Sequence, residues 1–321
     1  MIEYSMLYAF IGFMLASYSV IANDSVQTLG TFIASNSRLF KWYWLWAAAS
    51  AVLIITVTYG WIVNDGDISY GRLDKIPYQE IQWYHAAAPA VLVALTRFGV
   101  PVSTTFLVLS TFATTMVLEK MLVKSVVGYG LSAMVAYGTW MLLSRFINEK
   151  YNKVKVEHRN YWRIAQWGAT GFLWFSWLSH DMANIAVFLP RVLPVELLCG
   201  CLFVLVFWLG YIFKNNGGKI QNVVLEKTGS RFIRSATIID LVYAFLLYFF
   251  KELNSIPMST TWVFIGLLTG RELAIATTNR EEYHFGYVFP LIGRDFMKMM
   301  IGLSVSVAIV LTIHYLINPT S

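Results

Sequence analysis

Two aspartates interrupt long apolar stretches of the chain, and each has amide side chains beside it. Asp24 lies between Asn23 and Gln27, and Asp181 is followed three positions later by Asn184. A charged residue inside a membrane span is costly and marks a cavity or an ion pathway. Carboxylate and amide oxygens are hard ligands that suit a cation such as Na⁺, and a carboxylate can also relay a proton. The five residues are therefore candidate cation ligands, although helix capping would also explain them.

A second polar motif occurs twice, as Pro101-Val102-Ser103-Thr104-Thr105 and as Pro257-Met258-Ser259-Thr260-Thr261. Proline favours the first turn of a helix, where free backbone N–H groups and the positive end of the helix dipole attract anions. Hydroxyl groups in that turn add donors without adding charge. The alternative is that these hydroxyls bond back to helical carbonyls or pack between helices. The candidate anion-binding residues are Ser103, Thr104, Thr105, Ser259, Thr260 and Thr261.

The spacing of the two motifs indicates an internal duplication. Asp24 and Asp181 lie 157 positions apart, and Pro101 and Pro257 lie 156 positions apart. Two unrelated polar motifs share nearly one offset, which predicts that each half of the chain repeats the same structural unit.

The elements that must position these residues are apolar helices. The chain of 321 residues is 57% hydrophobic and only 13% charged, with a net charge of +6. So few charges could not coat a soluble protein of this length, and stretches long enough to cross a bilayer are present. The basic residues lie in short loops between apolar segments, as in membrane proteins, so no nucleic-acid partner is expected. No residue pattern of a membrane-embedded enzyme occurs.

About five apolar segments in each half predict an all-α polytopic membrane protein with discontinuous helices and two inverted repeats. An odd number of crossings places the second half on the opposite side, whether the short segments cross fully or form re-entrant hairpins. We assign 1–147 to the first repeat, 148–163 to a basic cytoplasmic linker and 164–321 to the second repeat. Both termini are then extracytoplasmic, in what we expect to be the inner (plasma) membrane.

The four motifs together resemble those of the inorganic phosphate transporter (PiT) family. That family carries an Asn-Asp signature and a later Pro-x-Ser-Thr-Thr motif in each half, in the same order. The residues that match are Asn23, Asp24, Gly30 and Thr31, then Asp181, Ala183 and Asn184, and the two motifs 101–105 and 257–261.

The resemblance implies a symporter with re-entrant hairpins that moves phosphate together with Na⁺ or H⁺. The Asn-Asp signatures would bind the cation, with sodium the first candidate, and the Ser-Thr-Thr tips would bind the anion. His180 and Asp240 are further candidates for proton or ion coupling. The expected partners are the oxyanion, the coupling cation and the lipid bilayer, without a cofactor, and a homodimer is one candidate assembly.

The chain departs from the family pattern beside the expected site. Gln27 and His180 replace signature asparagines, and Phe106 and Trp262 replace the histidine that follows each Ser-Thr-Thr. Transport of another oxyanion such as sulfate, or an uncoupled anion channel on the same fold, are therefore the alternatives to phosphate symport.

Overall fold

The computed structural model describes residues 2–100, 102–147, 156–225, 233–253, 257–278 and 285–313. All regular secondary structure in these ranges is helical, which confirms the predicted all-α class. Pro101 and the first half of the predicted linker, residues 148–155, lie outside the described residues.

The helices of the first half follow in the order α1 (Ile2–Val20), the π-helical turn η1 (Ile21–Ser25), α2 (Val26–Asn36), α3 (Trp42–Val63), α4 (Trp83–Arg97), α5 (Thr104–Leu107), the 3₁₀ turn η2 (Leu109–Thr111) and α6 (Thr115–Ile147). The second half contains α7 (Val156–Asp181), α8 (Ala183–Ala186), α9 (Val195–Lys214), α10 (Gln221–Leu225), α11 (Ile233–Leu253), α12 (Thr260–Thr278) and α13 (Phe285–Thr312). Helix α7 thus begins inside the range 148–163 that was assigned to the linker.

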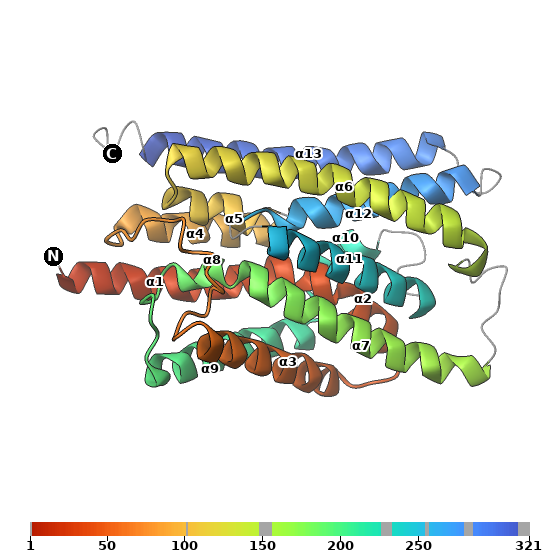
Figure 1. The fold of residues 1–321 in the computed structure, drawn as a ribbon, viewed down its shortest axis with the longest axis horizontal. Helices are drawn as coiled ribbons and strands as arrows, with labels where there is room; N and C mark the ends of the chain where they lie inside the picture. The colour runs from red at the N-terminus through yellow and green to blue at the C-terminus, as the bar shows by residue number, and fades with distance from the viewer. Residues whose placement is uncertain are drawn as a thin grey trace.

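The two halves run in opposite directions. Figure 1 shows the start of α1 and the end of α13 at one end of the molecule, and the end of α6 and the start of α7 at the other. Helices α4 and α5 form a hairpin whose two ends lie together. The Gln79 side-chain amide, just before α4, donates to the Phe112 carbonyl, just after η2, at 3.1 Å. Helices α11 and α12 form a second hairpin that enters from the opposite end (Figure 1).

Equivalent helices make equivalent contacts in the two halves. Helix α1 packs against α4, as α7 packs against α11, and the last helix of each half covers the hairpin of the other half, α6 on α12 and α13 on α5. This exchange brings the two hairpin tips together in the centre, where broken helices of both halves also meet.

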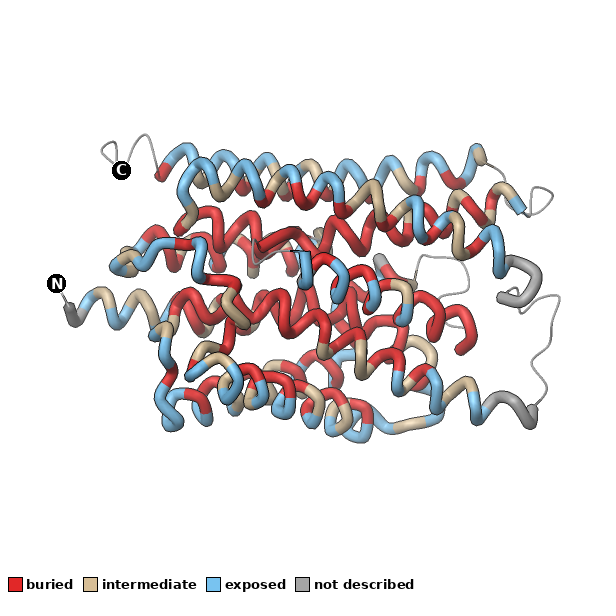
Figure 2. The backbone as a smooth tube through the Cα atoms, viewed as in Figure 1, coloured by how far each residue is buried: buried red, intermediate tan, exposed pale blue. Residues whose placement is uncertain are grey.

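The outer surface is apolar. Among the described residues, six helices are long and apolar enough to cross a membrane: Tyr4–Asn36, Trp42–Val63, Thr115–Leu143, Val195–Lys214, Ile233–Phe250 and Phe285–Thr312. Buried residues fill the centre of the bundle, and exposed ones face outward from α3, α6, α9 and α13 (Figure 2). Large apolar side chains such as Leu142, Phe203 and Met134 are exposed there. Since an exposed apolar surface of this extent needs a bilayer to cover it, the chain is an integral membrane protein.

Close packing of α6 against α12 depends on two glycines. A Cβ added to Gly266 would overlap the Tyr129 backbone, and one added to Gly270 would overlap the Ala133 carbonyl oxygen. Small residues spaced by four let helix backbones approach in membranes.

We expect Gly270→Ala to lower the thermal midpoint of the detergent-solubilised protein sharply or to prevent its accumulation, because overpacking costs about 1–3 kcal/mol or more. The matched control is Gly130→Ala on α6, where an added Cβ meets nothing within 4 Å. Equal melting curves for the two variants would show that the close approach is not required.

Candidate functional site

Asp24 lies in the π-helical turn between α1 and α2, where all five residues of η1 are buried. Such single-turn widenings of a helix are frequent at functional sites. One carboxylate oxygen of Asp24 accepts hydrogen bonds from the amides of Asn23 at 2.6 Å and Gln27 at 3.5 Å. The other accepts from the Thr104 hydroxyl at 2.5 Å. The carboxylate is therefore held by its own turn and by the tip of the first hairpin.

Asp181 occupies the equivalent break in the second half, at the end of α7 and just before α8. Its Oδ2 accepts from the Thr260 hydroxyl at 2.5 Å, which repeats the bond that Asp24 makes in the first half. Its Oδ1 accepts from the Asn184 amide at 3.3 Å and from the Thr105 hydroxyl at 3.5 Å. Asp181 thus contacts the tips of both hairpins.

The serine of each Ser-Thr-Thr motif caps the helix that follows it. The Ser103 hydroxyl oxygen accepts from the Phe106 N–H, and that of Ser259 accepts from the Trp262 N–H, both at 3.2 Å. The rings of Phe106 and Trp262 meet edge to face with centroids 5.7 Å apart. The two helices are unequal, because α12 has 19 residues and α5 has only 4. The sequence pattern suggested two matching helix ends, whereas the structure places a full helix dipole behind the second tip alone.

The tips also bond directly to each other. The Thr105 hydroxyl donates to the Met258 carbonyl at 3.2 Å, and the Thr261 hydroxyl donates to the Val102 carbonyl at 3.3 Å. Asn184 reaches across the halves to the Thr104 hydroxyl at 2.9 Å. Hence all four motif threonines donate to the protein itself, and an anion that enters here must displace some of these bonds.

Two buried oxygens in this centre have no hydrogen-bond partner. They are the side-chain Oδ1 atoms of Asn23 and Asn184, whose NH₂ groups donate to neighbouring oxygens. Orphaned buried acceptors are costly and call for an explanation, and both belong to asparagines whose NH₂ groups donate to the carboxylates of Asp24 and Asp181. The two carboxylates lie near each other, because Thr104 donates to Asp24 and accepts from Asn184, which in turn donates to Asp181. A cation among these oxygens would satisfy the amides and reduce the repulsion between the two carboxylates.

The donor set suits an alkali cation better than a transition metal. Within the described ranges, no group of three or more His, Cys, Asp or Glu side chains could hold a metal ion. Oxygen atoms from carboxylates, amides and hydroxyls are hard ligands, whereas zinc sites use imidazole and thiolate.

The two further coupling candidates lie at the edge of this centre. The buried His180 ring has its Nε2 2.8 Å from the Leu247 carbonyl oxygen. Asp240 accepts from the hydroxyls of Thr31 at 2.5 Å and Thr170 at 2.6 Å. Asp240 therefore joins α11 to α2 and α7, and these hydrogen bonds lead to neither aspartate of the centre.

Sequence reasoning missed Tyr243 and Arg72. The Tyr243 hydroxyl donates to the Thr260 carbonyl at 3.0 Å, but in the sequence this tyrosine is one aromatic residue in an apolar run. Arg72 is buried against His180, but in the sequence it lies in a polar, charged stretch between two apolar runs. Neither residue carries a local signal, because each reaches the site through tertiary folding.

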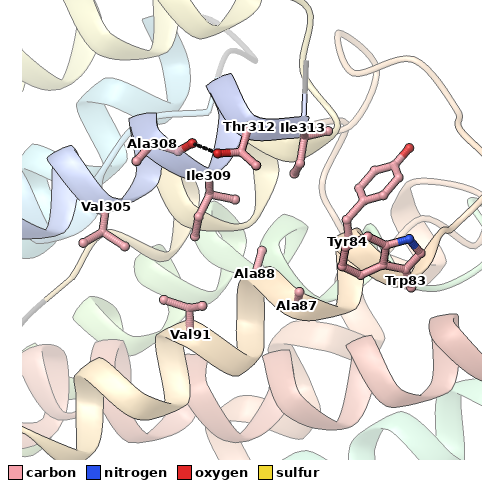
Figure 3. A pocket seen from close by; sticks show the side chains of 10 residues that line it. All are labelled: Trp83, Tyr84, Ala87, Ala88, Val91, Val305, Ala308, Ile309, Thr312 and Ile313. Carbon is pink, nitrogen blue, oxygen red and sulfur yellow. Dashed lines mark hydrogen bonds between the residues drawn. The ribbon is translucent and has the colours of Figure 1, made fainter. Parts of the chain in front are cut away.

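A pocket of about 370 Å³ lies between α4 and α13 (Figure 3). Its walls include Trp83, Ala88 and Val91 on one side and Val305 and Ile309 on the other. The lining is almost entirely apolar and contains none of the candidate site residues, so it does not suit an anion.

A second pocket, of about 300 Å³, has a mixed polar and apolar lining and lies between the end of α4 and the segment that follows α9. Arg97, Asn215 and Lys219 line it together with Ala22, the residue next to Asn23. It therefore reaches the buried turn that holds Asp24.

Inverted halves, broken helices and a buried polar centre where the halves meet are features that many secondary transporters share. One solved structure, described as "The sodium-dependent phosphate transporter", has the same fold with a TM-score of 0.64. The two chains are 18% identical over 97% of this chain and 99% of the other. The predicted fold is thereby confirmed. No family model matches the chain, and no curated protein matches it.

Proposed function

We propose that this protein is a cation-coupled symporter that carries an inorganic oxyanion, phosphate first, by alternating access. The observation that carries the proposal is the meeting of all four motifs at one buried centre, where Thr104 bonds to Asp24 and Thr260 bonds to Asp181. The fold shared with a sodium-dependent phosphate transporter supports it.

The cation, Na⁺ or a proton, binds at Asp24 and Asp181. For Na⁺ the further ligands are the amide oxygens of Asn23 and Asn184, with Gln27 nearby. The assignment is supported by the lack of a hydrogen-bond partner at the Asn23 and Asn184 Oδ1 atoms. A bound cation neutralises negative charge that would otherwise repel an oxyanion from the same centre.

The oxyanion binds between the hairpin tips, to the hydroxyls of Ser103, Thr104, Thr105, Ser259, Thr260 and Thr261 and to N–H groups at the start of α12. The bonds between the tips must open for this, so we assign the present conformation, in which the tips bond to each other, to a closed state. Movement of one half against the other then alternates access, and the pocket beside Arg97 and Lys219 is the cytoplasmic entrance. In this orientation both termini are extracytoplasmic.

The deciding experiment is uptake of radiolabelled phosphate into proteoliposomes with an imposed Na⁺ gradient, an imposed pH gradient, or neither. We expect uptake above that of empty liposomes under one gradient. The same assay with radiolabelled sulfate tests the alternative substrate. Absence of both uptakes under both gradients would refute the symporter, and an anion current that needs no cation would establish a channel.

A further inference from the structure

The pocket of about 370 Å³ between α4 and α13 lies outside the polar centre and has a different chemistry. Its walls are built from small and branched apolar side chains, among them Ala88 and Val91 on α4 and Val305 and Ile309 on α13 (Figure 3). Ligand pockets usually have volumes of about 300–1,000 Å³. The space is therefore large enough for a ligand of many atoms.

Helix packing leaves this space open. Helix α13 packs closely on α5 and η2, whereas α4 packs closely on α1. At Gly302 the covering helix comes near the hairpin tip, since a Cβ added there would lie 3.2 Å from the Val102 Cγ1 atom. Further along α13, Ile309 faces the pocket instead. The covering helix thus touches the first hairpin at its tip, and the pocket separates α13 from α4 beyond the tip.

The pocket offers a water molecule few partners. Of its lining side chains, only those of Trp83, Tyr84 and Thr312 carry polar atoms, and the Thr312 hydroxyl donates to the Ala308 carbonyl at 2.7 Å. Apolar cavities of this kind stay free of water, and walls that face empty space lose dispersion contacts. The ligand that stabilises such a pocket is therefore apolar.

The three residues that carry polar atoms gather at one end of the pocket (Figure 3). Helix α4 begins at Trp83 and α13 ends at Thr312, so this end of the pocket lies at the end of both helices. Trp83 is 54% exposed, and tryptophan is enriched where the membrane meets water. Val91 and Val305 line the other end (Figure 3). The pocket thus runs from a polar end into an apolar one, as a membrane lipid does.

The pocket is continuous with the surface that the bilayer covers. Val307 and Leu311 lie on α13 beside residues of the lining, and both are exposed large apolar side chains. Ala308, in the lining itself, is also exposed. Because lipid chains surround an apolar surface of this kind, they reach the pocket directly from the bilayer.

We propose that the pocket binds one acyl chain of a membrane phospholipid, with the head group at the Trp83 end and the chain between α4 and α13. The chain fills the space that helix packing leaves open and holds α13 against the first hairpin. None of the residues of the polar centre lines the pocket, so this binding requires neither Na⁺ nor an oxyanion and is independent of the proposed function.

The test compares lipid binding by the wild type and by Ala308→Phe, whose added ring fills the pocket from α13. Each protein is purified in detergent, supplied with phosphatidylcholine that carries brominated acyl chains, and weighed with its bound lipid by native mass spectrometry. We expect one tightly bound lipid on the wild type. We expect roughly tenfold weaker binding or more in the variant, because losing the burial of about two methylene groups has an effect of this size.

Tryptophan fluorescence locates the bound chain, because bromine quenches a tryptophan that it contacts. The wild type should lose fluorescence on binding the brominated lipid, and Trp83→Phe should lose less. Ala47→Phe is the matched control for the pocket-filling variant, because it adds the same ring to an exposed position of α3 outside the pocket and should leave lipid binding unchanged.

If Ala308→Phe does not accumulate, Ala87→Leu fills the pocket from α4 and should weaken lipid binding in the same way. Equal lipid binding by the wild type and the pocket-filling variant overturns the proposal, as does lipid binding that leaves Trp83 unquenched. A wild-type dimer that binds no lipid and that Ala308→Phe dissociates would assign this face to a second copy of the chain, and it would overturn the proposal too.

Discussion

Replacing Asp181 with asparagine is expected to abolish cation-driven uptake of the oxyanion. Asparagine keeps the shape of the side chain and can still accept from Thr260, but it removes the charge. Loss of one member of a buried charged set costs about 3–5 kcal/mol, so uptake should fall roughly a hundredfold or more. The measurement is the initial rate of radiolabelled phosphate uptake in proteoliposomes under the coupling gradient.

The matched control is Asp74→Asn, which removes a carboxylate from an exposed position in the α3–α4 segment and should leave uptake unchanged. Folding is checked by the thermal midpoint without added cation. If Na⁺ is the coupling ion, it should raise the midpoint of the wild type, as any ligand of the folded state does, but not that of Asp181→Asn. Wild-type uptake by this variant would show that Asp181 does not bind the cation.

The fold could be predicted from sequence because its signals are local and occur twice. Asp24 and Asp181, like Ser103 and Ser259, lie in polar interruptions of apolar runs, and a shared offset relates them. Their hydrogen bonds follow from the inverted repeat, since a contact in one half implies its counterpart in the other. The paired bonds from Thr105 and Thr261 to the opposite hairpin are an instance.

Other features depend on packing that no single segment encodes. Helix α5 ends after 4 residues, although its motif closely matches the one that begins the 19-residue α12, because the residues that follow differ in the two halves. The buried position of Arg72 requires Arg191 to anchor a distant segment. In sequence both arginines are ordinary loop cations, so their packing emerges only from the folded structure.

Removing the hydroxyl of Thr260 should reduce uptake of the oxyanion nearly as strongly as the Asp181→Asn substitution does. Valine matches threonine in shape, but the Thr260→Val protein lacks the donor that reaches the Asp181 carboxylate at 2.5 Å. In the anion-bound state it also lacks one of the donors to the oxyanion. A hydrogen bond to a charged group contributes about 1.5–3 kcal/mol, so we expect a loss of roughly ten- to a hundredfold in uptake rate.

Thr260→Ser distinguishes the hydroxyl from the packing of the methyl group, because it keeps the donor and should retain uptake within about threefold of the wild type. The internal repeat predicts a second effect. Thr104→Val removes the equivalent hydrogen bond to Asp24 and should lower the uptake rate by a similar factor. Unchanged uptake in both valine variants would mean that the hydroxyls only support the hairpins. A large loss in Thr260→Val alone would instead assign the anion to the tip that the long α12 helix supports, since the 4-residue α5 supplies a weaker dipole.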